Sequence, residues 1–164
     1  MTPNDGCVLC SPEQAADLFG RRTVWQNNLW RLSMIEQGSP VIGFAHLEPV
    51  RHIPYLTDLA GEEAATLGPT LARVTNTLKA VTGADLVYVY VFGERVAHLH
   101  LNLAPHREGD ALLGGPGLIR AGAPAISSEE LTAVSQAVET ALGAGRHETR
   151  TPRRTWASEH GGDG

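Results

Sequence analysis

The sequence predicts an α+β fold, in which an antiparallel sheet packs against one long helix and a C-terminal helix follows. Short segments rich in valine, tyrosine and leucine, bounded by glycine and proline, indicate strands. Two other segments repeat apolar residues at helical spacing. With 164 residues, of which 42% are hydrophobic, the chain is long enough to bury one ordinary core. We expect one domain over residues 1–145 and a disordered polar tail over residues 146–164.

The first predicted elements are an arm and a hairpin. Residues 1–22 predict an irregular arm with a short helix that opens at Ser11 and ends at Gly20. Residues 29–35 and 41–47 predict two strands. Turn-forming residues lie between these strands, so we expect the pair to form a hairpin.

The long helix is expected to begin at Thr57 or Asp58, which are favourable N-cap residues, and to end at Gly83. Over residues 67–81, leucines and valines recur at spacings of four and three, which gives the helix one buried stripe. Pro69 interrupts this stretch, so we expect a kink or a late start there.

Residues 86–92 and 96–103 predict a second pair of strands. In the later strand apolar and polar residues alternate, which places His98, His100 and Asn102 on one face.

The remaining elements are a loop and a second helix. Residues 108–126 are rich in glycine, proline and alanine and predict the loop. Ser127 and Glu130 match a capping box at the start of the helix. His46, in the second strand of the first hairpin, is interpreted as a surface residue of that strand.

Charge and composition exclude several function classes. The net charge of −5 is not that of a protein that coats nucleic acid. No run of about 18 apolar residues exists, so no membrane span is expected. Residues 1–6 have neither the basic nor the apolar stretch of a secretory signal, so a cytoplasmic location is expected. In a reducing compartment the close pair Cys7 and Cys10 indicates metal binding or redox activity rather than a structural disulfide.

His98, His100 and Asn102 are the strongest chemical feature of the sequence. Three polar side chains on one face of a strand that is apolar on the other face indicate a functional site. The alternative is a half-exposed edge strand that carries two surface histidines.

Residues 96–105 resemble the signature of the histidine triad superfamily, His-x-His-x-His with apolar x, and Pro105 stands where a proline commonly follows. Residues 43–52 resemble the second strand of that family, which ends in Pro-x-x-His, and residues 53–59 resemble the entry to its long helix. The resemblance covers residues 7–110. It implies a HIT-like sheet and helix arrangement and chemistry on a nucleotide or nucleotide conjugate.

The resemblance also implies that the middle histidine, His100, is the nucleophile. A neutral imidazole can attack phosphorus near pH 7, forming a phosphoramidate from which water or another acceptor takes the nucleotidyl group. The expected activity is therefore that of a nucleotide phosphoester hydrolase or nucleotidyltransferase with a covalent nucleotidyl-histidine intermediate.

Asn102 departs from the signature, because the third position is histidine in the hydrolase branches. In this respect the chain is similar to members like galactose-1-phosphate uridylyltransferase, whose branch has Gln there, and like dinucleoside polyphosphate phosphorylase. An amide can donate a hydrogen bond to phosphate but cannot give up a proton as an acid. Asn102 therefore favours transfer, phosphorolysis or a substrate with a good leaving group. The alternative is a catalytically inactive, zinc-stabilised nucleotide-binding or interaction module.

Cys7, Cys10, His52 and His98 form the second chemical pattern. Two thiolates and two imidazoles complete a tetrahedral zinc site with no open position. The resemblance to zinc-bearing members of the superfamily implies these four ligands for a structural Zn²⁺, which would hold the arm against the catalytic strand. A redox pair or an idle thiol pair are the alternatives for the two cysteines.

Three further residues are candidates for substrate binding. Glu36, seven residues before Gly43, stands where the family has a ribose-binding acid, and its alternative is a solvated turn glutamate. Arg95 is a candidate for holding phosphate oxygens, against the alternative of a turn arginine in water. His106 stands where many relatives have Arg and is a third candidate for phosphate.

Family members usually pair through the long helix and the strand next to it. We therefore expect a homodimer joined through residues 62–82 and 86–92, where the apolar run at 87–91 is long for a domain of this size.

Overall fold

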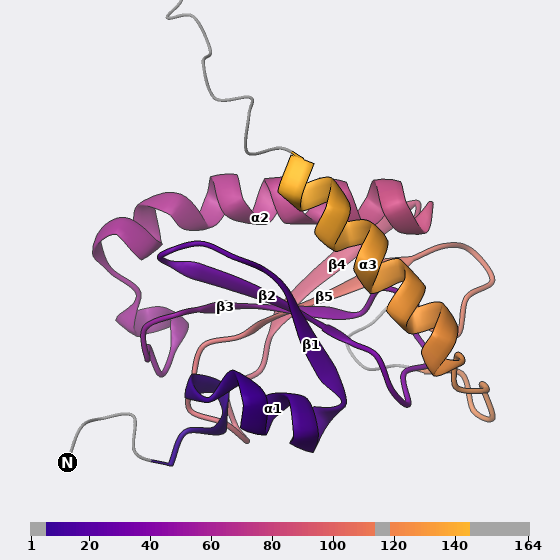
Figure 1. Cartoon of the computed structure of the whole chain (residues 1–164), viewed down its shortest axis with the longest axis horizontal. Helices are drawn as coiled ribbons and strands as arrows, with labels where there is room; N and C mark the ends of the chain where they lie inside the picture. Colours follow the sequence, from indigo (N-terminus) through magenta and orange to yellow (C-terminus); the bar gives the residue numbers. More distant parts are fainter. Residues whose placement is uncertain (1–5, 114–118, 145–164) are drawn as a thin grey trace, which may run out of the picture.

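A five-stranded antiparallel sheet organises the chain (Figure 1). The computed structural model describes residues 6–113 and 119–144. The strands lie in the order β1-β2-β3-β5-β4. Their bounds are β1 (Arg21–Gln26), β2 (Trp30–Ile35), β3 (Ala45–Pro49), β4 (Leu86–Val91) and β5 (Leu101–His106). The helices are η1 (Val8–Cys10), α1 (Pro12–Phe19), η2 (Leu56–Asp58), α2 (Gly61–Thr82) and α3 (Ser128–Ala144). The predicted α+β class is confirmed.

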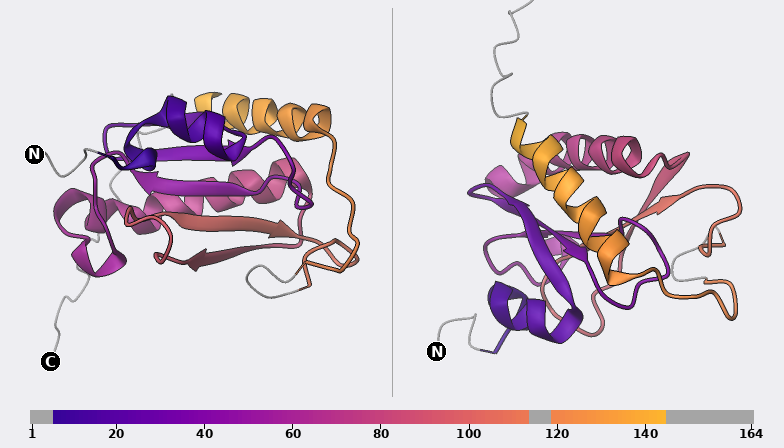
Figure 2. Two further views of the ribbon diagram at one scale, coloured as in Figure 1. Left: turned by 90° about the horizontal axis from the view of Figure 1, so that it is seen from below. Right: turned by 45° about the vertical axis from the view of Figure 1, so that its right-hand side comes forward.

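Helices α2 and α3 pack on one face of the sheet, and α1 lies on the opposite side (Figures 1 and 2). Fully buried side chains fill the space between the sheet and the two long helices, and burying each stabilises the fold by about 1.5–3 kcal/mol. The set includes Trp30, Leu32 and Leu103 from the strands and Val74, Leu78, Val138 and Leu142 from the helices. Side chains alternate along a strand, so Asn102 points to the face that α2 and α3 leave open.

Strand β1 was not predicted, because its first two residues were assigned to the arm. Its sequence begins with Arg21 and Arg22, which are poor indicators of a buried strand. Arg21 is nevertheless almost completely buried, because both ends of its guanidinium donate to Glu48 of β3, at 3.0 Å each. A buried ion pair thus takes the place of the apolar pattern that would have revealed the strand.

Two strands begin later than predicted. Strand β3 begins at Ala45, not at residue 41, and β5 begins at Leu101, not at residue 96. The prediction that His98 and His100 lie in the strand with Asn102 is therefore wrong. The Leu99 amide donates to the Ile53 carbonyl at 2.7 Å, so the backbone here pairs with the loop after β3.

The long helix also differs from the prediction at its start. Thr57 and Asp58 form η2, where the Asp58 carboxylate accepts from the Tyr55 amide at 3.1 Å, and α2 begins at Gly61. The helix then continues through Pro69, so no late start occurs there. Its end is as predicted, because Gly83 adopts a φ of 65°, which favours glycine.

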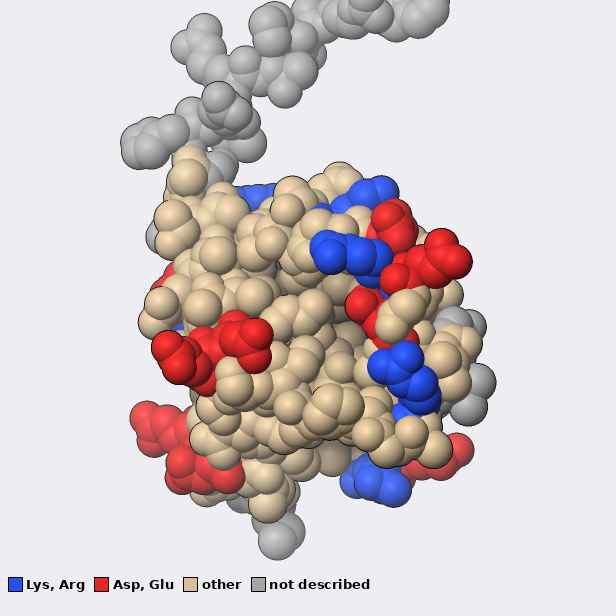
Figure 3. Space-filling model, turned by 90° about the vertical axis from the view of Figure 1, so that its right-hand side faces the viewer, with Lys and Arg blue, Asp and Glu red and all other residues tan. Residues whose placement is uncertain are grey.

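The C-terminal helix confirms its predicted cap. The Ser127 hydroxyl bonds the Glu130 carboxylate at 2.7 Å and accepts from the Glu130 amide at 3.2 Å. The tail predicted over residues 146–164 lies outside the described residues. Among the helices of the described residues, none is long and apolar enough to cross a membrane. On the face shown in Figure 3, acidic side chains lie along the left, acidic and basic side chains lie next to one another on the right, and the centre is uncharged.

Candidate functional site

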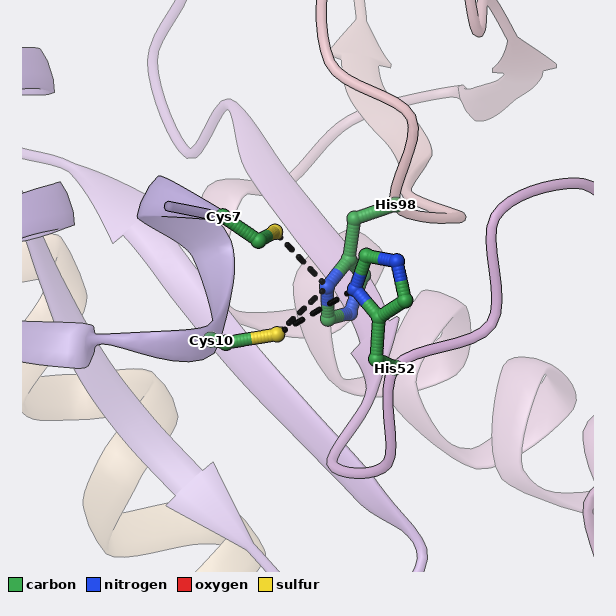
Figure 4. A group of neighbouring side chains, drawn as sticks. All are labelled: Cys7, Cys10, His52 and His98. Atoms are coloured by element: carbon green, nitrogen blue, oxygen red, sulfur yellow. Dashed lines mark hydrogen bonds between the residues drawn. The ribbon is translucent and has the colours of Figure 1, made fainter. Parts of the chain in front are cut away.

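The chain brings four metal-binding side chains together from three distant segments (Figure 4). Cys7 directly precedes η1 and Cys10 is its last residue, whereas His52 follows β3 and His98 precedes β5. One donor atom from each of the four lies within 4.8 Å of all the others. The Cys10 Sγ lies 3.3 Å from the His52 Nδ1 and 3.4 Å from the His98 Nδ1, and the Cys7 Sγ lies 3.5 Å from the His98 Nδ1.

A backbone carbonyl orients the buried histidine of this cluster. The Nε2 atom of His98 lies 3.0 Å from the Pro49 carbonyl oxygen. A carbonyl can only accept, so Nε2 carries the proton and the Nδ1 lone pair points toward the thiols. Burial lowers the pKa of His98, which keeps the ring neutral.

The two thiols are better suited to binding a divalent cation together than to lying side by side as thiolates without one. Burial raises the pKa of the Cys10 thiol to about 11, and the neighbouring Cys7 adds to the rise. Two adjacent thiolates are therefore unfavourable unless a cation compensates their charge. Two sulfur and two imidazole donors form the tetrahedral set that Zn²⁺ prefers, so the residues present fit zinc.

A buried ion network holds the arm next to this cluster. Glu48 is fully buried and accepts from Arg21 at 3.0 Å and from Arg31 at 2.6 Å. Arg31 also donates to the Leu9 carbonyl, which belongs to η1 between the two cysteines. The network was missed from the sequence, because three charged residues on three separate strands show no common pattern before the strand register is known.

His100 lies beside a cavity on the other side of the same segment. Its Nδ1 atom lies 2.7 Å from the His98 carbonyl oxygen. Nδ1 therefore carries the proton, and the Nε2 lone pair is free to act as a nucleophile. The cavity has a volume of about 350 Å³. It is lined by Phe92, Glu94, Arg95, His100 and Asn102.

The cavity thus brings together three of the predicted site residues, His100, Asn102 and Arg95. The Asn102 side chain lies in β5 and its Nδ2 atom donates to the Tyr90 carbonyl of β4 at 3.2 Å. Arg95 is exposed, in the turn between β4 and His98.

The structure does not bring Glu36 or His106 to the cavity. Glu36 is paired with Arg22 at 2.8 Å, and Arg22 also pairs with Glu139 of α3 at 2.7 Å. His106 ends β5, at the end away from His100, and its ring packs against Tyr88 with centroids 5.4 Å apart. The predicted ribose role of Glu36 and the predicted phosphate role of His106 therefore receive no support from this geometry.

His46 is a site residue that the sequence interpretation missed. It is only partly exposed, it pairs in register with Asn102, and its ring lies edge-to-face on His100 with centroids 5.8 Å apart. Burial, with a further effect from Arg21, lowers its pKa to about 4. The pairing of residues 45–47 with residues 101–103 is the pattern that would have revealed it, because it sets a histidine opposite the third triad position.

Neither a family model nor a curated protein matches this sequence. Solved structures match the fold. A histidine triad protein from Bradyrhizobium japonicum is 22% identical, with a TM-score of 0.65 over 74% of this chain and 90% of that one. This chain has the fold of the histidine triad proteins.

Two further histidine triad structures relate to the site. A zinc-bound histidine triad family protein from Mycobacterium smegmatis is 19% identical, with a TM-score of 0.59 over 86% of this chain and 98% of that one. Diadenosine triphosphate hydrolase from Plasmodium falciparum is 11% identical, with a TM-score of 0.57 over 75% of this chain and 77% of that one. The histidine triad fold of this chain thus also occurs in a zinc-bound protein and in a nucleotide hydrolase.

Proposed function

We propose that this chain is a nucleotide phosphoester hydrolase or nucleotidyltransferase that works through a covalent nucleotidyl-His100 intermediate. The observation that carries the proposal is the hydrogen bond from the His100 Nδ1 to the His98 carbonyl at 2.7 Å. This bond fixes the tautomer in which Nε2 has its lone pair free beside a cavity of about 350 Å³. That volume lies within the usual range for small-molecule sites.

The proposed reaction has two balanced steps. The His100 Nε2 attacks phosphorus, and the bond from phosphorus to the leaving-group oxygen breaks with its electron pair going to that oxygen. In the second step an oxygen of water, phosphate or a sugar phosphate attacks the same phosphorus, and the bond from phosphorus to Nε2 breaks with its electron pair returning to Nε2. When water is the acceptor its proton goes to the solvent, and His100 is again a neutral imidazole with its proton on Nδ1. The Arg95 guanidinium, which also lines the cavity, is placed to stabilise negative charge on the phosphate oxygens.

Asn102 bears on the class of leaving group. Its amide cannot give up a proton, so the leaving group departs most easily as a stable anion. Phosphoanhydrides such as dinucleoside polyphosphates meet this condition. The structural likeness to a diadenosine triphosphate hydrolase also supports dinucleoside polyphosphates as the first compounds to test.

We further propose that Cys7, Cys10, His52 and His98 hold a structural Zn²⁺. All four donors belong to the protein, which leaves no position for substrate on a tetrahedral ion. Bound there, the ion would fix the arm to the segment that carries His100. The zinc-bound relative of the same fold supports this proposal.

A homodimer through α2 and β4 is our proposal for the assembly. Strand β4 is an edge strand, and Leu86, Val89 and Val91 of this strand are exposed. A hollow of about 470 Å³ runs between α2 and β4, with Leu71 and Val87 in its lining. An exposed apolar edge strand needs a cover, and a second copy of the same face supplies one.

The first experiment is a substrate screen with the zinc-loaded protein. Diadenosine triphosphate, UDP-glucose and adenosine 5′-phosphoramidate are each incubated with the protein, with and without added phosphate. Intact-mass spectrometry detects the nucleotidyl adduct, and chromatography detects turnover. An adduct with at least one compound supports the proposal. If none gives an adduct or turnover, the result contradicts the proposal and favours the alternative of an inactive module.

A further inference from the structure

Asn102 is held from both sides by its neighbours in the sheet. Its Nδ2 atom donates to the Tyr90 carbonyl of β4 at 3.2 Å. On the other side it pairs in register with His46 of β3. Asn102 thus lies between Tyr90 of β4 and His46 of β3.

His46 is in turn fixed by aromatic contacts on two sides. Its ring meets Phe44 with centroids 5.3 Å apart and planes at 82°, and it meets His100 with centroids 5.8 Å apart and planes at 81°. Both are edge-to-face contacts, which aromatic rings prefer over flat stacking. Phe44 is itself packed against the apolar cluster of Val41 and Leu112, so it does not yield easily.

His46 is uncharged in this environment. Burial is the main cause, and the guanidinium of Arg21 and the ring of His100 act in the same direction, while Glu48 and the Asn102 amide oppose them. A neutral imidazole is a poor proton donor. The contribution of His46 therefore comes through the ring that it contacts, His100.

We propose that His46 is a positioning residue of the site: held by its contact with Phe44 and by its place opposite Asn102 in the sheet, it packs edge-to-face on His100 and fixes the direction in which the His100 Nε2 points. This inference rests on the proposed function and deepens it. His100 precedes β5, so its side chain lacks the support of a regular strand. One hydrogen bond at Nδ1 leaves its ring free to tilt about that bond, and the contact with His46 removes this freedom.

The inference also gives Asn102 a defined role. Its amide nitrogen donates to the Tyr90 carbonyl, which fixes the side chain against β4, and its backbone lies opposite His46 in the sheet. Asn102 then supports His46 from the neighbouring strand.

The test compares two apolar substitutions, His46→Leu and His46→Phe, in the zinc-loaded full chain. Leucine fills the space but offers no planar edge to His100, whereas phenylalanine keeps the ring. Single-turnover formation of the nucleotidyl adduct is measured over a range of concentrations of diadenosine triphosphate, UDP-glucose and adenosine 5′-phosphoramidate. Misplacing a reacting group by about 1 Å can cost about 100-fold. We therefore expect His46→Leu to lower the maximal rate by about 10- to 100-fold with little change in half-saturating concentration, and His46→Phe to recover most of that loss.

Ser33→Ala is the matched control. Ser33 is buried in β2 and pairs in register with His46 from the side opposite Asn102. It should keep the wild-type rate. A His46→Leu variant that forms the adduct at the wild-type rate overturns the inference and leaves the proposed function standing. A loss that His46→Phe does not recover also overturns it. If the wild type forms no adduct with any of the three compounds, the proposed function fails and the inference fails with it.

Discussion

The four-residue cluster and the His100 cavity are two regions that share one short segment, and they use a histidine in opposite ways. In the cluster, the His98 Nε2 donates a hydrogen bond to the Pro49 carbonyl, so Nδ1 points toward the two thiols. At the cavity, the His100 Nδ1 donates a hydrogen bond to the His98 carbonyl, so the lone pair of Nε2 stays free. One region is closed by four protein donors, while the other is open. The difference shows that the carbonyl to which each ring donates decides which imidazole nitrogen keeps a free lone pair.

The two regions are also connected, because the carbonyl that holds His100 belongs to His98. A shift of His98 within the cluster therefore moves the acceptor of the His100 hydrogen bond. We expect substitutions in the cluster to change the geometry of the cavity, and substitutions in the cavity to leave the cluster unchanged.

The largest expected effect is on the cluster. Cys10→Ala should remove the bound zinc and, since binding energy at a structural zinc is folding energy, lower the unfolding free energy by several kcal/mol. That loss corresponds to a fall of about 10 °C or more in Tm. Elemental analysis and thermal unfolding measure both, with Ser11→Ala as a neighbouring control. A zinc content near zero in the wild type after zinc-supplemented expression would contradict the proposal.

The second prediction concerns a substitution that weakens the attachment of the arm to the sheet and leaves all four cluster ligands in place. Glu48→Gln leaves the guanidiniums of Arg21 and Arg31 buried without their carboxylate. Breaking a buried ion pair by removing one partner costs about 3–5 kcal/mol. Because Arg31 also holds the Leu9 carbonyl, zinc affinity should fall as well. Glu139→Gln, at an exposed ion pair on α3, is the control and should change stability by less than about 1 kcal/mol.

The third expected effect is a dependence of stability on pH that arises from His46, next to His100 at the cavity. Burial holds the pKa of His46 at about 4 in the folded chain, well below the ordinary histidine value of 6.5. The unfolded chain therefore binds the proton first on acidification, so the unfolding free energy falls as pH drops from about 6.5 to 4 and is fully retained above that window. The loss is at most about 3 kcal/mol. Urea unfolding at pH 7 and pH 4.5 should show a smaller loss for His46→Phe, and equal losses in both proteins would contradict the assignment.

The smallest effect on chemistry is expected at the α2–β4 face, which lies apart from both regions. Val89→Asp places a charge on the exposed edge strand and should convert a dimer to a monomer in sedimentation at micromolar concentration. Zinc content and adduct formation should remain those of the wild type. A wild-type protein that sediments as a monomer would remove the dimer from the account.

The fold was largely predictable because periodic apolar residues report burial directly. The alternating spacing of residues 67–81 gave the long helix, and the valine-rich segment gave β4. The same logic failed where burial was achieved by charge. Arg21 can begin a buried strand because it forms an ion pair with Glu48. A partner on another strand cannot be identified from the sequence before the register is known.

The site was predictable in its donor chemistry and not in its cross-strand contacts. Cys7, Cys10, His52 and His98 could be grouped because sulfur and imidazole donors are rare and point to one kind of ion. His46 was missed because its importance arises from pairing with Asn102 and from the approach of a residue outside the strand, His100. The partner of Glu36 could not be predicted either, since Arg22 lies on the strand that the sequence does not reveal.

The measurement that tests the central claim most directly is peptide mapping of the nucleotidyl adduct by mass spectrometry. The wild type and His100→Ala are compared with the compound that the screen selects. We expect the wild type to carry the nucleotidyl group on His100, and His100→Ala to form no adduct and lose turnover while keeping the Tm and zinc content of the wild type. His100 is half-buried beside a cavity and not in the main core, so its removal should leave the fold intact. Full turnover in His100→Ala, or an adduct that maps to another residue such as His46, would contradict the account.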